Sequence, residues 1–104
     1  MRRALVSVHD VSAGVLEEAI PGESYRFRYL DSYSGPPVSL TMPTAGLQFV
    51  YDRFPPFFDG LLPEGMQLEG LLRVKKIDRR DYFSQLVAVG QDLVGAVTVE
   101  EIPA

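Results

Sequence analysis

Residues 24–29 read Ser-Tyr-Arg-Phe-Arg-Tyr, a regular alternation of aromatic and polar side chains. Successive side chains of a β-strand point to opposite faces. Tyr25, Phe27 and Tyr29 therefore share one face, and Arg26 and Arg28 share the other. The pattern predicts a strand of an antiparallel sheet that is buried on one face and exposed to water on the other.

Two more strands are predicted before this one. Ala4–Val8 is a short run rich in β-branched residues, and the polar pair His9-Asp10 indicates a turn. The chain returns over Val11–Ile20, where Gly14 marks a bulge or a close approach of backbones. Pro21-Gly22 then provides a strong turn signal. Together with residues 24–29, these segments predict an antiparallel meander.

The middle of the chain is rich in turn-forming residues. Residues 31–47 contain many Ser, Gly, Pro and Thr, so we expect a loop. Val38–Met42 is interpreted as a short edge strand, a place where neighbouring prolines are tolerated. From Leu47 to Phe58 the chain is aromatic and interrupted by Pro55-Pro56, which predicts an irregular path.

A first helix is predicted from the spacing of three leucines in the last third. Leu68, Leu71 and Leu72 recur at helical spacing, and Pro63 suits the first turn of a helix. Gly65 and Gly70 each weaken this helix by about 1 kcal/mol relative to alanine.

A second helix is predicted from its end signals. Asp78 is the expected N-cap, with Asp81 three residues later, and Gly90 is the expected stop. Its apolar stripe is Tyr82, Phe83, Leu86 and Val87. Val94–Val99 is then expected as a closing strand and Glu100–Ala104 as a tail.

The order of these elements indicates the fold class. Strands come first, helices follow, and one strand returns at the end, which is typical of an α+β fold rather than of a βαβ repeat. We expect residues 1–104 to form a single domain with a small antiparallel sheet, a meander plus the returning C-terminal strand, and two helices in its C-terminal half.

Composition excludes several classes of function. Ten Lys and Arg against fourteen Asp and Glu give a formal charge of −4, which argues against general nucleic-acid binding. The absence of cysteine excludes disulfides and thiolate sites, and one histidine, His9, cannot form a His-rich metal cluster. No segment approaches the roughly 20 apolar residues that span a bilayer. We expect a cytoplasmic protein without catalysis, cofactor or metal.

The most unusual stretch is Phe57–Gly65, Phe-Phe-Asp-Gly-Leu-Leu-Pro-Glu-Gly. The pattern alone favours a structural loop that leads into a helix. The functional alternative is a rigid loop that presents Glu64, Gly65 and Met66 to a partner. A phosphate-binding loop is excluded, because no Lys-Ser or Lys-Thr follows the glycines.

Other polar features have simpler interpretations. Arg73–Arg80 concentrates five cationic residues, which indicates a solvated helix end, with docking to an acidic partner or nucleic acid as the alternative. His9-Asp10 suggests a catalytic pair, but a surface turn is the better interpretation. The pairs Glu17-Glu18 and Glu100-Glu101 point to opposite faces of a strand, so we expect them to be solvated.

Three blocks of the sequence resemble the N-terminal domain of HipA-type serine/threonine kinases, the toxins of bacterial toxin–antitoxin operons. They are Val8–Leu16, Phe57–Gly65 and Asp81–Val97. The middle block is the most specific of the three. The other two support it, because the blocks keep the order and spacing that they have in the HipA-type domain. The resemblance covers nearly the whole chain.

The sequence departs from these kinases in what it lacks. The ATP loop, the catalytic Asp and the Mg²⁺ ligands that phosphoryl transfer requires are not in the 104 residues. A stand-alone chain of this kind resembles the HipS subunits of tripartite HipBST systems. The resemblance implies an antitoxin that binds a HipT-like kinase, with a HipB-like protein as the DNA-binding partner.

This resemblance, together with the loop, gives a candidate partner-binding segment. Its residues are Phe58, Asp59, Gly60, Leu61, Leu62, Pro63, Glu64, Gly65, Met66 and Gln67. Met66 is expected to fill an apolar pocket of the kinase, and Glu64 to meet a basic group near its phosphate site.

The alternative hypothesis is an N-terminal structural domain of a HipA-type kinase, which stabilises the kinase and contacts its antitoxin without inhibiting it. The start at Met1 and the short acidic and apolar end at Ala104 favour the independent protein.

Overall fold

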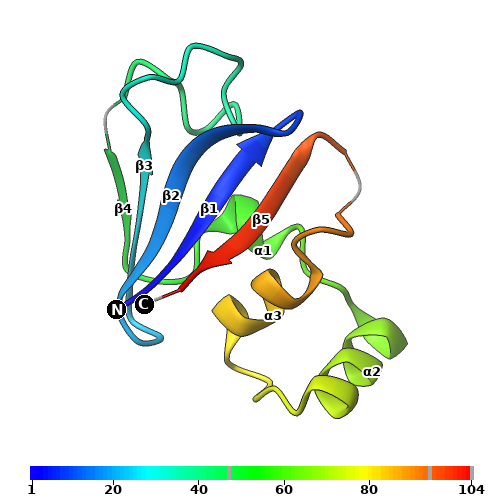
Figure 1. The fold of residues 1–104 in the computed structure, drawn as a ribbon. Coiled ribbons are helices and arrows are strands. Elements are labelled where there is room, and N and C mark those ends of the chain that lie inside the picture. The colour runs from blue at the N-terminus through cyan, green and yellow to red at the C-terminus, as the bar shows by residue number, and fades with distance from the viewer. Residues whose placement is uncertain (47, 94, 104) are drawn as a thin grey trace.

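The computed structural model describes residues 1–46, 48–93 and 95–103. The strands in these residues form one antiparallel sheet in the order β4-β3-β2-β1-β5 (Figure 1). Their bounds are β1 Arg2–Val8, β2 Val11–Ile20, β3 Ser24–Tyr29, β4 Gln48–Tyr51 and β5 Val97–Ile102. The helices α1 Pro56–Asp59, α2 Gly65–Lys75 and α3 Tyr82–Val89 all lie in the C-terminal half. The predicted α+β class is confirmed.

The first hairpin follows the sequence prediction closely. His9 and Asp10 both have positive φ, 50° and 65°, as a two-residue turn between twisted strands requires. Gly14 explains the close approach, because a Cβ there would lie 2.6 Å from the backbone oxygen of Arg28. The register between β1 and β2 also shifts beside this glycine, so Ala13 is an extra residue.

The aromatic face of β3 forms the centre of the core. Tyr25, Phe27 and Tyr29 are buried, whereas Arg28 is exposed on the other face. Phe58 from α1 packs against Phe27, with ring centroids 5.9 Å apart. The core therefore lies between the sheet and the helices α1 and α3. Its most buried residues are Ala4, Val6, Ala13, Leu16, Phe27, Phe58, Phe83 and Leu86.

The prediction for the edge of the sheet was wrong. Val38–Met42 forms no strand: an isolated bridge joins Ser39 to Met42, and both ends of the segment turn inward. The edge is instead β4, in the region predicted to be irregular, because Phe49 pairs opposite Phe27 and extends the aromatic face. Leu47 lies outside the described residues.

The helix starts also differ from the prediction. Pro63 precedes α2, whose N-cap is Glu64. The N-cap of α3 is Asp81 rather than Asp78, because the Asp81 carboxylate accepts a hydrogen bond from the backbone N–H of Ser84 at 3.1 Å. Asp78 instead closes the preceding turn.

The predicted stop of α3 is correct, but its cause is a close contact. Gly90 has an ordinary right-handed φ, and a Cβ there would lie 1.9 Å from the carbonyl oxygen of Val99. The returning strand runs further than predicted. Glu100–Ile102, expected in the tail, belong to β5 and pair with β1. Val94 and Ala104 lie outside the described residues.

The three helices differ in how closely they pack against the sheet. In Figure 1, α1 lies behind the sheet and α3 below β5, whereas α2 lies at the periphery. No residue of α2 is buried. Across the described parts of the chain, no helix is long and apolar enough to traverse a bilayer.

Candidate functional site

The first half of the segment Phe58–Gln67 is anchored to the body. Phe58 is fully buried, and Leu61 and Leu62 are partly buried against the core. The backbone is tied locally, because the N–H of Gly60 donates to the Pro56 carbonyl and that of Leu61 to the Phe58 carbonyl, at 3.0 and 3.1 Å. These bonds and buried side chains fix the path of the chain up to Leu62.

The second half of the segment projects into solvent. Glu64, Gly65, Met66 and Gln67 are exposed, and the Met66 side chain is 91% exposed. Gly65 has a φ of +59°, a conformation that glycine adopts without strain and that turns the chain from extended Glu64 into α2. The result is an apolar side chain held away from the body at the start of a helix.

A cleft of about 300 Å³ lies beside this projection. It brings together four residues of the predicted segment with three from the end of α3 and the following loop. Its lining residues are Leu61, Leu62, Pro63, Gln67, Val89, Asp92 and Leu93. A mostly apolar cleft next to an exposed methionine can accept an apolar side chain of another protein.

The structure separates the other predicted residues from this cleft. Phe58 belongs to the core, and Gly60 is the C-cap of α1. Asp59 faces a different hollow, lined with Arg53 and Tyr82. The ten predicted residues therefore divide into three parts. Phe58–Gly60 form the anchor, Leu61–Pro63 and Gln67 form the cleft wall, and Glu64–Met66 form the exposed tip.

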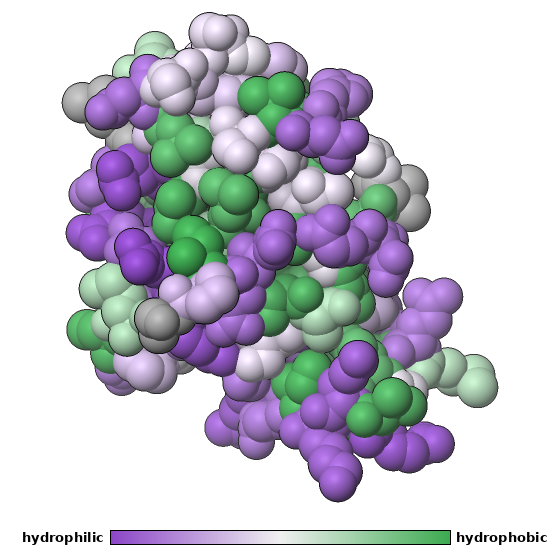
Figure 2. Space-filling view, viewed as in Figure 1, coloured by the Kyte–Doolittle hydropathy of each residue, from purple (hydrophilic) through white to green (hydrophobic). Residues whose placement is uncertain are grey.

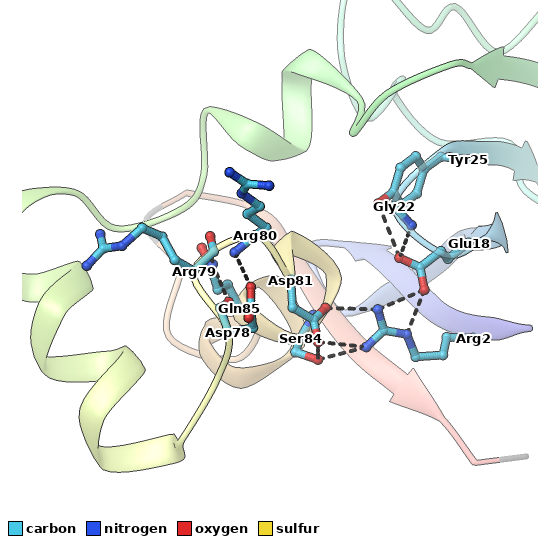
Figure 3. Close-up of polar contacts among 10 residues, drawn as sticks. All are labelled: Arg2, Glu18, Gly22, Tyr25, Asp78, Arg79, Arg80, Asp81, Ser84 and Gln85. Atoms are coloured by element: carbon cyan, nitrogen blue, oxygen red, sulfur yellow. Dashed lines mark hydrogen bonds and ion pairs between the residues drawn. The ribbon is translucent and has the colours of Figure 1, made fainter.

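A polar network at the start of β1 was missed by the sequence analysis (Figure 3). The Arg2 guanidinium donates to Glu18 at 2.8 Å, to Asp81 at 2.8 Å and to Ser84 at 2.7 Å. It also lies 4.8 Å from the ring centroid of Phe83. Arg2 thus joins the sheet to the first turn of α3.

Two pKa values reflect this network. Burial, reinforced by the Glu18 carboxylate, raises the pKa of Tyr25 to about 12. Burial also opposes ionisation of Asp81, but hydrogen bonds from Arg2 and Ser84 outweigh that effect and lower its pKa. The Asp81 carboxylate, which caps the N-terminal end of α3, is therefore ionised at neutral pH.

The expectation that Glu17 and Glu18 are solvated was wrong. Both are buried, with exposed fractions of 6% and 3%. Arg26 pairs with Glu17 at 3.2 Å, and Arg2 pairs with Glu18 at 2.7 Å. The two carboxylates point to opposite faces, as predicted, but each faces an arginine from a neighbouring segment.

The remaining polar candidates have ordinary surroundings. His9 is exposed in its turn, and the cations of Arg73–Arg80 are exposed, as predicted. Among residues 1–46, 48–93 and 95–103, no three His, Asp or Glu side chains gather as a metal site would require.

The network could have been found from two sequence signals. Asp81 and Ser84 are three residues apart, a spacing that favours an N-cap. Glu18 lies opposite Arg2 once the two-residue turn and the bulge beside Gly14 together fix the register of β1 and β2. No comparable sequence signal indicated that Val89, Asp92 and Leu93 line the cleft.

Comparisons with known proteins agree with this architecture. The family model of the HipA N-terminal domain matches residues 4–100. An uncharacterised protein of Haemophilus influenzae is 32% identical over 101 residues, which cover 97% of this chain and 93% of that protein. The solved structure of an N-terminal domain of HipA toxin is 29% identical, with a TM-score of 0.77 over 99% of this chain and 94% of the other.

The sequence family and the fold therefore point to the same relationship. The matched residues include the meander, the anchored segment, α3 and most of β5. The HipA N-terminal domain is a non-catalytic domain of a toxin–antitoxin kinase family. With its arrangement of sheet, helices and projecting segment, the chain belongs to the family of HipA N-terminal domains.

Proposed function

We propose that this chain is a HipS-like antitoxin, which binds a HipT-like serine/threonine kinase and inhibits it in the cytoplasm. The observation that carries the proposal is the 91% exposed Met66, held by an anchored segment beside an apolar cleft. Removing the apolar Met66 side chain from water is favourable, and in this position only a partner protein would cover it.

The division of the segment supports inhibition by a rigid tip. Phe58 and the backbone bonds after it fix the base, so little conformational entropy is lost when the tip binds. Met66 then enters an apolar pocket of the kinase, and Glu64, exposed next to it, meets a basic group near the phosphate site.

The larger complex includes a HipB-like protein that contacts DNA. This chain has a formal charge of −4, which supports a role without direct nucleic-acid contacts. A separate polypeptide also makes inhibition dependent on concentration, whereas a fused domain would bind at a fixed effective concentration.

The test is a kinase assay with the purified HipT-like kinase. We expect autophosphorylation to fall as the chain is added, and the inhibition constant to rise at least about tenfold for Met66→Asp. Leu40→Asp is the matched control, because Leu40 is 95% exposed and belongs to the β3–β4 connection, which Figure 1 places at the opposite end of the view from α2. Unchanged kinase activity at saturating protein would refute the proposal.

A second candidate function is favoured by the likeness to an N-terminal domain of HipA toxin. In that case the domain would stabilise a HipA-type kinase and contact its antitoxin without inhibiting it. The reading frame decides between the two, because the first function needs a separate kinase gene and the second a continuous frame.

A further inference from the structure

One face of α2 is apolar and exposed. Met66, Gly70 and Val74 are spaced four residues apart, so they share a face of the helix. Met66 is 91% and Val74 is 76% exposed. The leucines of α2 are on the opposite side and are half-buried, which places that side toward the rest of the chain. We call Met66, Gly70 and Val74 the outer face of α2.

Figure 2 shows the same feature on the molecular surface. Hydrophobic residues lie among strongly hydrophilic ones in the lower right part of the view, where Figure 1 places α2. When a helix carries apolar side chains on two opposite sides, burying both sides requires a neighbouring element or molecule on each. Within the described chain, only the leucine side has such a neighbour.

Gly70 is a second, independent sign that this face is used. A glycine in a helix interior costs about 1 kcal/mol relative to alanine. A Cβ at Gly70 would meet no atom within 4 Å, so the packing of this chain does not require the glycine. Its missing side chain leaves the backbone open to close approach from outside, between the two exposed apolar residues.

The charges beside the outer face indicate the chemistry of the partner. Arg73 and Lys75, in the last turn of α2, and Lys76, its C-cap, are exposed and make no ion pair with any residue in the described ranges. Arg79, by contrast, is paired with Glu69 at 2.6 Å. An occupant that is apolar opposite Gly70 and acidic near Arg73 would complement both properties.

We propose that the outer face of α2 is a docking surface for the HipT-like kinase, through a segment with an apolar side chain over Gly70 and an acidic residue beside Arg73. The inference rests on the proposed function and extends the contact of Met66 to Gly70 and Val74. Met66 acts on kinase activity, whereas Gly70 and Val74 contribute affinity along two further turns of the helix.

The test measures binding and stability separately. Isothermal titration with the purified kinase should give at least about tenfold weaker binding for Gly70→Leu, because the added side chain fills the space that the partner needs. Gly70→Ala should raise the melting temperature of the free chain and yet weaken binding. Opposite signs in the two measurements distinguish a partner contact from a folding effect.

A second variant does not depend on the glycine. Val74→Gln introduces a better helix former but removes an apolar contact, and we expect several-fold weaker binding. Leu40→Gln is the matched control and should bind as the wild type does. Arg73→Glu should also weaken binding and reduce its dependence on salt.

The possible results separate the two proposals. If the wild type binds and inhibits while Gly70→Leu and Val74→Gln bind equally well, the docking surface is overturned and the proposed function remains. If the wild type does not bind the kinase at all, both are overturned. If the α2 variants lose affinity while circular dichroism shows them folded and Leu40→Gln binds as the wild type does, the docking surface is supported.

Discussion

Helices α2 and α3 are neighbours in the sequence but stand in opposite relations to the core. On α3, Phe83 and Leu86 are fully buried and Gln85 is 2% exposed, with its amide donating to the carbonyl of Arg79 at 2.9 Å. On α2 nothing is buried. The difference indicates that α3 contributes far more than α2 to the core of the domain.

The largest expected effect comes from removing a buried aromatic side chain of α3. Phe83→Ala should reduce the free energy of unfolding by about 3–5 kcal/mol, because it leaves a cavity under Arg2 and the sheet. Val74→Ala on α2 should change it by less than about 0.5 kcal/mol. Urea unfolding measures both, and equal losses would erase the contrast between the two helices.

Alkaline pH should lower the free energy of unfolding, because Tyr25 deprotonates. Its pKa is about 12 in the folded chain, above the ordinary value near 10, so the unfolded chain loses this proton first. The stabilisation is complete below pH 10 and is lost as pH rises to 12, by about 2–3 kcal/mol. Urea unfolding at several pH values checks this.

The matched control is Tyr25→Phe, which keeps the ring but removes the titrating hydroxyl. Its stability should fall less steeply between pH 10 and 12 than that of the wild type. Parallel curves for the two proteins would mean that another group causes the alkaline loss.

Removing Arg2 should cost about 2 kcal/mol. Arg2→Ala leaves the buried Glu18 carboxylate without its cation and breaks the tie to α3. The paired comparison is Arg79→Ala, which breaks the exposed bridge to Glu69 and should cost at most about 1 kcal/mol. Similar losses for the two arginines, measured by thermal unfolding, would contradict a special role for the network.

The smallest expected effect is that of the α3 cap. The lowered pKa of Asp81 means that its carboxylate stabilises the fold above the ordinary pKa near 4, and that this contribution is lost as pH falls through the lower folded value. Asp81→Asn should cost about 1 kcal/mol at pH 7 and nothing further in acid. A wild-type advantage that persists at pH 2 would argue against this assignment.

The meander could be predicted because its signals are local. The alternation of residues 24–29 gives the buried face, and the turn at His9-Asp10, together with the bulge that Gly14 indicates, gives the register of the first hairpin. The edge strand could not be found in this way. Phe49 is in a strand only because Phe27 of β3 lies opposite, and four residues between turn-rich segments carry too little periodicity to indicate it.

The candidate site was predictable in position but not in form. The unusual composition of Phe57–Gly65 located it, and the exposure of Met66 agrees with the predicted presentation to a partner. The cleft wall contributed by Val89 and Leu93 was missed, because these residues reach the segment only through the packing of α3. Partner binding by the ten residues stays a prediction.

The pairing of the first strand with the last has a consequence for biosynthesis. Arg3 at the beginning of the chain lies opposite Ile102 near its end, and β1 is flanked by β2 and β5. On the ribosome, the meander and the helices emerge before β5, so one side of β1 stays unpaired until β5 has also emerged. Until then β1 offers an open strand edge to any other nascent chain, so rapid pairing of β5 with β1 helps to avoid aggregation.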